Sequence, residues 1–280
     1  MNVVIVGLGL IGGSVALALR EARPDAEIVG VDRASVLATD AVKRLSKRLV
    51  DAADAAAVSA AFERSELVVL AAPVRVIVEL VPRALVGAPL VTDCGSTKRS
   101  IALAADASAR RGRFVPGHPM AGAREGGAEL ARADLFRDRR WLLCPEKSDA
   151  DAADAIEGLV KSFGAVPVRL GIDEHDRAVA RTSHATQLVT SALAVAASGA
   201  SAEHAAGPAF EGATRSAGGS EGIWNDIFAT NADEVASALG DIIGELERVR
   251  RELAKTPPDV EAARALLRRA KETRRGHQGR

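Results

Sequence analysis

Met1-Asn-Val-Val-Ile-Val-Gly-Leu-Gly-Leu-Ile-Gly-Gly-Ser14 opens the chain and decides its fold. The β-branched run Val3–Val6 is typical of a buried strand, and the apolar stretch from Leu10 to about Leu19 is typical of a helix. The glycines with G-x-G-x-x-G spacing are Gly7, Gly9 and Gly12. The first permits a tight turn, the second lets a pyrophosphate approach the backbone, and the third lets helix and strand pack closely. This predicts a dinucleotide site at the helix N-terminus.

An acidic residue supports the same interpretation. A second apolar run, Ala26–Val31, ends in Asp32, twenty residues after Gly12, where a carboxylate accepts the hydrogen bonds of an adenosine ribose. A simple glycine turn explains neither the third glycine nor Asp32. The carboxylate would repel a 2′-phosphate, which favours NAD, whereas Arg33 beside it leaves NADP open. The predicted nucleotide contacts are Gly7, Gly9, Leu10, Ile11, Gly12, Asp32, Arg33, Ala72 and Pro73.

Composition narrows the class of protein. The 280 residues suffice for two domains, and 37 Lys and Arg balance 37 Asp and Glu, so no global field attracts nucleic acid or a membrane. Cys94 and Cys144 lack metal-type spacing, and no uninterrupted apolar run reaches the length of a membrane span. We expect a soluble, cytoplasmic protein. Tyrosine is absent, which excludes a dehydrogenase mechanism that uses a Tyr hydroxyl for proton transfer.

Strand and helix patterns alternate through the first 170 residues. The expected helices cover 35–45, 54–62, a stretch opened by Pro73, 101–109 and 149–163. The further expected strands cover 67–71, 90–93, 113–116, 141–144 and 166–170. Such alternation predicts a parallel doubly wound sheet, whose ligands lie outside the carboxyl ends of the strands.

Strand signals stop at Gly171. One long, mostly apolar helix is expected over 172–198, then a Gly/Ser-rich loop over 207–222 and helices over 223–231 and 233–253. A last helix follows Pro257-Pro258. Its end holds seven basic residues and one acidic residue in the final seventeen, which favours a solvated, frayed tail over a nucleic-acid arm. We therefore expect a nucleotide domain over 1–170 and an all-helical domain over 171–280.

Two polar clusters follow strands and should lie at the ligand edge of the sheet. In the first, Asp93-Cys-Gly-Ser-Thr-Lys98, Ser96 is either a site residue or only the N-cap of the next helix. In the second, Gly117-His-Pro-Met-Ala-Gly122, a stiff loop holds His118. An imidazole there suits a general base, the alternative being a loop histidine without a role.

The third cluster lies on the long helix. Helical spacing directs Ser183, His184 and Gln187 together into a cleft. His175, about half a turn away, is assigned a structural role.

These residues resemble the prephenate and arogenate dehydrogenases of tyrosine biosynthesis. The motifs of the resemblance, in order, are Gly7-Leu-Gly-Leu-Ile-Gly-Gly-Ser14, Asp93 to Lys98, Gly117 to Gly122, His175-Asp176 with Ser183-His184, and Ala213-Thr-Arg215 followed by Trp224-Asn-Asp-Ile227. The resemblance implies an α/β Rossmann-type doubly wound sheet followed by an all-helical dimerisation domain. It also implies a homodimer that oxidatively decarboxylates a cyclohexadienol with NAD or NADP, without a metal.

Residue roles follow from the same resemblance. It implies that His118 accepts the hydroxyl proton, that Ser96 hydrogen-bonds the same centre, and that Arg215 binds a substrate carboxylate. His184 would line the substrate pocket. Because Arg215 lies in a Gly/Ser-rich stretch, the alternative interpretation is that it is only a solvated surface charge.

Gln187 departs from the family pattern, because many prephenate-specific members have a second histidine there. A neutral side chain tolerates the ammonium of arogenate, so prephenate, arogenate and dual specificity stay open. Within enzymes, the alternatives are an amino-substituted prephenate substrate and a 2-hydroxyacid-type dehydrogenase. The latter usually needs a helix lysine that this chain lacks between Lys161 and Lys255. A non-catalytic dinucleotide sensor would have no reason to keep Ser96, His118 and Arg215.

Overall fold

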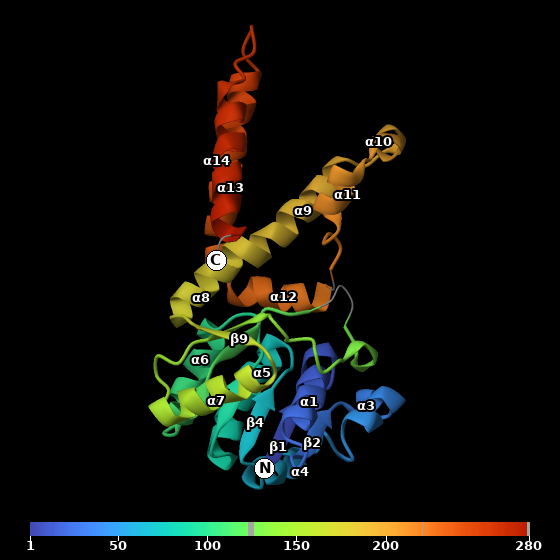
Figure 1. Cartoon of the computed structure of the whole chain (residues 1–280), viewed down its shortest axis with the longest axis vertical. Helices are drawn as coiled ribbons and strands as arrows, with labels where there is room; N and C mark the ends of the chain where they lie inside the picture. Colours follow the sequence, from blue (N-terminus) through green and yellow to red (C-terminus); the bar gives the residue numbers. More distant parts are fainter. Residues whose placement is uncertain (123–125, 220, 279–280) are drawn as a thin grey trace. The chain divides into compact units, whose positions relative to one another are not determined.

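The structure is a computed structural model that describes residues 1–122, 126–219 and 221–278. Contacts divide the chain into two compact units, residues 1–232 and 233–280, each described by itself (Figure 1). The first unit contains both sheets and every residue for which the sequence predicts a role in a site. The second consists of two helices.

A six-stranded parallel sheet, in the order β3-β2-β1-β4-β5-β6, forms the centre of the first unit. Its strands are β1 (Asn2–Val6), β2 (Glu27–Asp32), β3 (Arg48–Asp51), β4 (Leu67–Leu70), β5 (Val91–Asp93) and β6 (Phe114–Val115). The order reverses beside β1, so the glycine turn after Val6 lies at the switch point where such sheets bind ligands. The predicted doubly wound sheet is confirmed, although the edge strand β3, with polar residues at both ends, was not predicted.

Alternating side chains of the strands build two cores. Val3 and Ile5 of β1 join one apolar cluster, whereas Val4 and Val6 join the other. This is the period of two expected for a strand covered on both faces. The helices around the sheet are α1 (Leu10–Ala22), α2 (Ala34–Leu37), α3 (Asp40–Leu45), α4 (Ala55–Glu63), α5 (Val74–Gly87), α6 (Arg99–Asp106) and the 3-10 turn η1 (Arg111–Arg113).

The single helix expected over 35–45 is in fact two short helices. Thr39 adopts an extended backbone between α2 and α3, and its hydroxyl accepts a hydrogen bond from the Val42 backbone N–H. A threonine at this position caps a new helix better than it continues an old one. The alanine-rich composition concealed this break.

A second, three-stranded sheet, in the order β7-β8-β9, carries His118. Its elements are β7 (Gly117–Pro119), the 3-10 turn η2 (Ala128–Leu130), β8 (Arg140–Leu143), α7 (Ala150–Ser162) and β9 (Val166–Arg169). The expected strand-helix-strand of β8, α7 and β9 is confirmed. The expected loop around His118 is wrong, because β7 pairs antiparallel with β8 and places His118 opposite Leu142.

The helical part of the first unit follows β9. Its elements are α8 (Ile172–Val179), a π-helical turn η3 (Ala180–His184), α9 (Ala185–Ala196), α10 (Ala200–Ala205), α11 (Pro208–Thr214) and α12 (Glu221–Thr230). Figure 1 shows α8 and α9 as one continuous rod, as expected for 172–198. The loop expected over 207–222 is wrong for its first half. Pro208 begins α11 at a position where its missing N–H costs nothing.

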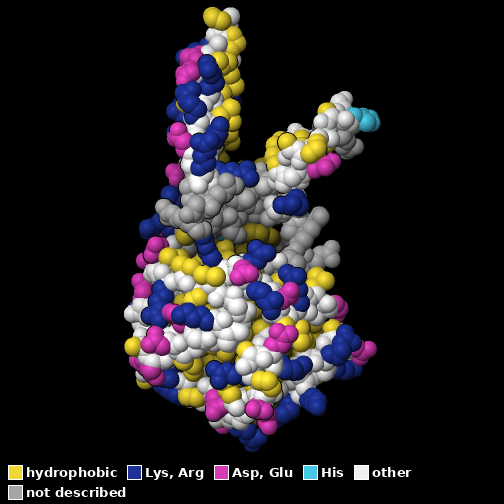
Figure 2. All heavy atoms as spheres, in the orientation of Figure 1, with side chains coloured by type: hydrophobic (Ala, Val, Ile, Leu, Met, Phe, Trp, Pro, Cys, Tyr) yellow, Lys and Arg dark blue, Asp and Glu magenta, His cyan; other side chains and the backbone are white. Residues whose placement is uncertain are grey.

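The second unit is the helix pair α13 (Ala232–Leu253) and α14 (Glu261–Gln278). Arg269 donates two hydrogen bonds, of 3.0 and 2.7 Å, to the carboxylate of Glu245 and so joins the two helices. Hydrophobic side chains line one side of the pair in Figure 2. The exposed large apolar residues of this unit are Ile243, Leu246, Leu253, Val260 and Leu267. Fraying of the last two residues, 279–280, lies outside the described part of the chain.

Candidate active site

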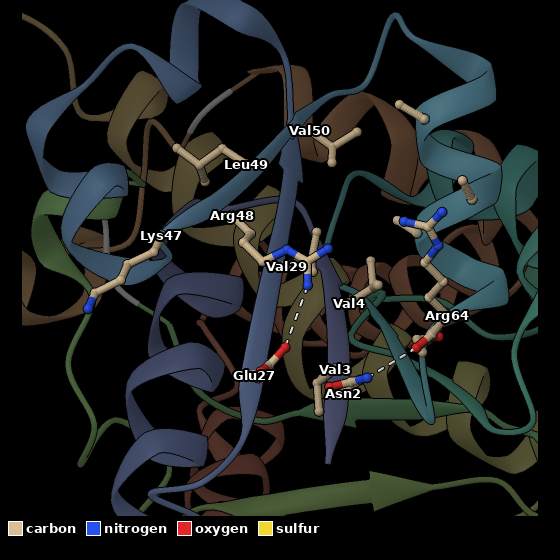
Figure 3. A pocket seen from close by; sticks show the side chains of 14 residues that line it. Asn2, Val3, Val4, Glu27, Val29, Lys47, Arg48, Leu49, Val50 and Arg64 are labelled. Atoms are coloured by element: carbon tan, nitrogen blue, oxygen red, sulfur yellow. Dashed lines mark hydrogen bonds and ion pairs between the residues drawn. The ribbon is translucent and has the colours of Figure 1, made fainter.

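Two cavities lie at opposite ends of the six-stranded sheet. One, of about 430 Å³, lies beside α4 at the amino ends of β1 and β2, with the Arg48–Glu27 ion pair across it (Figure 3). It contains none of the predicted site residues. The other, of about 1030 Å³, lies outside the carboxyl ends of the strands and brings the glycine turn together with His118 and Arg215. Because doubly wound sheets bind ligands at that edge, the larger cavity is the candidate active site.

The glycine turn has the geometry that a pyrophosphate requires. Gly7 has a φ of +89°, and a Cβ on Gly12 would overlap the Gly7 carbonyl oxygen, so turn and packing both demand glycine. A Cβ on Gly9 would meet nothing within 4 Å, which leaves the backbone open to the cavity. Among the described residues, no side chain caps α1, so its first N–H groups are available to an anion.

Asp32 lies at the end of β2, outside the lining of this cavity. Its carboxylate accepts hydrogen bonds of 2.7 Å from the backbone N–H groups of Leu8 and Arg33. The acid therefore fixes the glycine turn to the neighbouring strand. Arg33 itself is exposed. Ala72 and Pro73 follow β4 and line the cavity with Leu10 and Ile11, so the structure brings these predicted nucleotide contacts together.

His118 is the first member of a buried chain of polar groups. Its Nδ1 lies 2.9 Å from Nε2 of His175, and Nδ1 of His175 lies 2.8 Å from Oδ1 of Asp176. His175 and Asp176 are fully buried, whereas His118 borders the cavity. Burial, followed by the charges of His175 and Lys98, lowers the pKa of His118 well below its ordinary value. The imidazole is therefore neutral at neutral pH and able to accept a proton.

The turn after β5 holds Ser96 at the cavity and fixes β7 beside it. The carboxylate of Asp93 accepts hydrogen bonds from the backbone N–H groups of Gly95, at 2.8 Å, and Gly117, at 3.1 Å. The buried Lys98 ammonium is paired with the same carboxylate. A buried charge pair with further hydrogen bonds positions both cavity segments.

Ser96 is not the N-cap of α6. That helix begins at Arg99, with Lys98 in the N-cap position. Asp176 accepts from the backbone N–H groups of Lys98, at 2.7 Å, and Arg99, at 2.9 Å. A carboxylate 77 residues away thus replaces the local cap, which no local pattern predicts, and Ser96 remains a cavity residue.

Ser183, His184 and Gln187 lie together on the helical wall, as the spacing predicts. The Asn231 side-chain amide donates to Nδ1 of His184 at 3.3 Å, which leaves the other ring nitrogen to carry the proton. Burial lowers the pKa of His184 to about 4. His184 is therefore a neutral hydrogen-bond donor at neutral pH.

Arg215 follows α11, is exposed, and lines the cavity. Within the described part of the chain, its guanidinium has no carboxylate partner. Gly218, with a φ of +78°, turns the chain after it, and Trp224 on α12 lines the cavity beyond. Arg215 is thus a cation with unused donors at a cavity of the size that holds small ligands.

Sequence reasoning missed the residues that fix the helical wall. Asp226 of α12 pairs with Arg75 at 3.0 Å, at the start of α5. The hydroxyls of Thr97 and Thr230 lie 2.8 Å apart. These pairs join segments more than 130 residues apart, so only folding brings them together.

The structural role assigned to His175 was also incomplete, because its ring contacts His118. His175 does not line the cavity, in agreement with helical spacing, but its contact with His118 joins segments 57 residues apart. The adjacent pair His175-Asp176 was the sequence feature that could have indicated a carboxylate-bound histidine.

Two family models match the chain. One, described as "Prephenate dehydrogenase, nucleotide-binding domain", matches residues 15–169. The other, described as "Prephenate dehydrogenase, dimerization domain", matches residues 172–268. Together they cover β2 to β9, the helical wall of the cavity and most of the second unit, whereas β1 and the glycine turn precede the first match.

Individual proteins agree with these matches. The prephenate dehydrogenase of Bacillus subtilis is 30% identical over 260 residues, 89% of this chain and 69% of that protein. A cyclohexadienyl dehydrogenase of Zymomonas mobilis is 27% identical over 270 residues, 92% of this chain and 90% of that protein. The crystal structure of prephenate dehydrogenase from A. aeolicus, in complex with hydroxyphenyl propionate and NAD+, is similar at a TM-score of 0.82. It is 25% identical, and the match covers 100% of this chain and 98% of that one.

Proposed function

This chain belongs to the prephenate dehydrogenase family, and we propose that it converts prephenate to 4-hydroxyphenylpyruvate by NAD-dependent oxidative decarboxylation. The observation that carries the proposal is the single cavity in which His118 and Arg215 share walls with the glycine turn. A proton acceptor, a carboxylate-binding cation and a pyrophosphate-binding turn are the groups this reaction needs. The alternatives within the family are an enzyme that oxidises arogenate and an enzyme that accepts both prephenate and arogenate.

The reaction assigns one task to each group. His118 accepts the proton of the ring hydroxyl, and Ser96 hydrogen-bonds the same oxygen. NAD held at the glycine turn would supply the acceptor for the hydride of the hydroxyl-bearing carbon. The bond to the ring carboxylate then breaks, carbon dioxide leaves, and the electron pair makes the ring aromatic. His118 returns its proton to the oxygen, which becomes the phenol, so a neutral imidazole is regenerated.

Recognition of the substrate would come from the helical wall. Arg215 can pair with both oxygens of a carboxylate, because its donors form a planar fork. His184 and Gln187 offer neutral groups beside it. Gln187 carries no charge at any working pH, which favours arogenate as the second candidate substrate.

A steady-state assay with both substrates and both nucleotides tests the proposal. We expect turnover of prephenate with NAD to give the highest kcat/KM of the four combinations. A higher kcat/KM with arogenate would show that arogenate is the preferred substrate, and the proposed oxidative decarboxylation would still hold. Turnover of neither substrate would refute the proposed function.

Asp32 should set the preference for NAD over NADP. Like charges brought together cost several kcal/mol, so Asp32→Asn is expected to lower the ratio of kcat/KM for NAD to that for NADP by about tenfold. The asparagine side chain still has an oxygen that can accept from the Leu8 N–H. The variant therefore removes the negative charge while keeping the hydrogen bond that fixes the glycine turn. An unchanged ratio, or a wild-type preference for NADP, contradicts this assignment.

We further propose that residues 1–170 form the nucleotide domain and 171–280 a substrate and dimerisation domain that pairs two copies. Leu193 and Val195 on α9 support this, because they are 43% and 73% exposed in a single chain. Apolar surface of this kind marks interfaces.

None of the described helices has the length and apolar character that crossing a bilayer requires.

Solution scattering should give a mass twice that of the 29.1 kDa chain. The double substitution Leu193→Glu and Val195→Glu should reduce it to one chain, because the interface would bury two charges. Val86→Glu is the matched control, because Val86 is 76% exposed on the nucleotide domain. A concentration-independent monomer in the wild type contradicts the homodimer.

A further inference from the structure

Asp176, His175 and His118 are joined by two hydrogen bonds, and the donor and acceptor of each bond can be assigned. Asp176 is fully buried, and its carboxylate is anchored by the backbone N–H groups of Lys98 and Arg99. Burial raises the pKa of Asp176, but the hydrogen bonds from His175 and from the Arg99 backbone outweigh burial and lower it. Asp176 is therefore an ionised carboxylate, which can only accept hydrogen bonds.

The position of each proton follows from that carboxylate. Nδ1 of His175, 2.8 Å from Asp176, must carry a proton to donate. Burial lowers the pKa of His175, although Asp176 opposes this, so the ring is neutral at neutral pH and its Nε2 has a lone pair. That lone pair faces Nδ1 of His118 at 2.9 Å. Nδ1 of His118 must then be the donor.

We propose that His175 and Asp176 are positioning residues that hold His118 as its Nδ1-protonated tautomer and leave Nε2 as the acceptor toward the cavity. This inference rests on the proposed function, in which His118 takes the hydroxyl proton. His175 touches His118 rather than the substrate, so it acts through the base. The same chain stabilises the cation that forms when Nε2 is protonated, because Asp176 is an anion at its far end.

The other charges around the pair do not supply this function. Lys98 is paired with the Asp93 carboxylate, and His184 faces His118 as a further titratable group. Arg99 lies beside Asp176, with its Nε 3.7 Å from Oδ2. Both Lys98 and His184 lower the pKa of His118, so they oppose its protonated form. A positive charge on His175 would oppose it in the same way, so the support for a protonated His118 comes from the neutral His175 ring, which accepts from Nδ1, and from the anionic Asp176 beyond it.

The tautomer can be measured without turnover. Protein labelled with 15N in histidine, saturated with NAD, gives long-range 1H–15N correlations that distinguish a ring protonated on Nδ1 from one protonated on Nε2. His118→Gln identifies the resonance. We expect His118 to be protonated on Nδ1 in the wild type. Protonation on Nε2 overturns the inference, whether or not the enzyme oxidises prephenate.

Two isosteric variants separate positioning from a merely structural role. His175→Gln places an amide oxygen near the former Nε2, where it still accepts from His118. His175→Asn keeps a donor near the former Nδ1, toward Asp176, but leaves His118 without an acceptor. Both lose one hydrogen bond of the buried chain.

We expect His175→Gln to retain the Nδ1-protonated tautomer and a kcat within about threefold of wild type. His175→Asn should shift the proton to Nε2 and lower kcat about tenfold, the equivalent of one net hydrogen bond, with substrate KM unchanged. Equal kcat losses in both variants, or a retained tautomer in His175→Asn, contradict positioning. If neither variant folds, the wild-type tautomer alone decides.

Discussion

His118→Ala should lower kcat by roughly 10²–10⁴-fold, the usual contribution of a positioned general base. KM for the substrate should stay within a few fold, because the hydroxyl is a small part of the bound molecule. His118 borders the cavity and is neutral, since burial and neighbouring positive groups lower its pKa. Initial rates of nucleotide reduction at saturating NAD measure both constants.

The matched control is His204→Ala, because His204 is exposed on α10 and does not line the cavity. Its kcat should equal that of the wild type. A near-normal kcat in His118→Ala would show that another group is the base. The pH profile adds a check. Since the pKa of His118 is lowered, activity should persist below the ordinary histidine range and be lost only in more acidic solution.

Arg215→Ala should raise KM for the substrate by about 30-fold or more. Removing one partner of a desolvated, hydrogen-bonded ion pair costs about 2–5 kcal/mol, and 30-fold corresponds to about 2 kcal/mol. The guanidinium lines the cavity, and no carboxylate of the described residues satisfies it. KM for NAD should scarcely change.

Two further variants sharpen this test. Arg215→Lys should recover only part of the loss, because an ammonium cannot pair with both carboxylate oxygens in a fork. Arg139→Ala, at an exposed position outside the cavity, should leave KM unchanged. A substrate KM within about twofold of wild type in Arg215→Ala would show that Arg215 is only a solvated surface charge.

The sequence predicts those features of the fold that depend on local periodicity. The alternation of Val3, Val4, Ile5 and Val6 between two cores follows directly from the period of a strand. The glycine spacing predicts the turn at Gly7, where φ is +89°. Local chemistry was sufficient for these elements because neighbours along the chain determine them.

Other features depend on distant partners and could not be predicted. The local sequence offers Ser96 as an N-cap of α6. Asp176 takes that role instead, because a buried carboxylate that accepts from two backbone N–H groups is strongly favoured. His118 lies in a strand only because β8 is available to pair with β7. Short strands of this kind carry too few residues for a pattern.

The cavity itself was predicted in outline. The rule that ligands lie at the carboxyl ends of parallel strands brought Ser96 and His118 together correctly. Helical spacing placed His184 and Gln187 on the same wall. It also kept His175 off that wall, and the structure buries His175 against His118, a contact between distant segments that helical spacing alone does not predict.

The stoichiometry of one reaction tests whether this protein is an oxidative decarboxylase. Purified protein is incubated with prephenate and NAD, and reduced nicotinamide, carbon dioxide and 4-hydroxyphenylpyruvate are quantified together. We expect equal amounts of all three, formed at a rate that His118→Ala lowers by roughly 10²–10⁴-fold. If protein shown to bind NAD forms no reduced nicotinamide with either prephenate or arogenate, the proposed dehydrogenase activity is wrong.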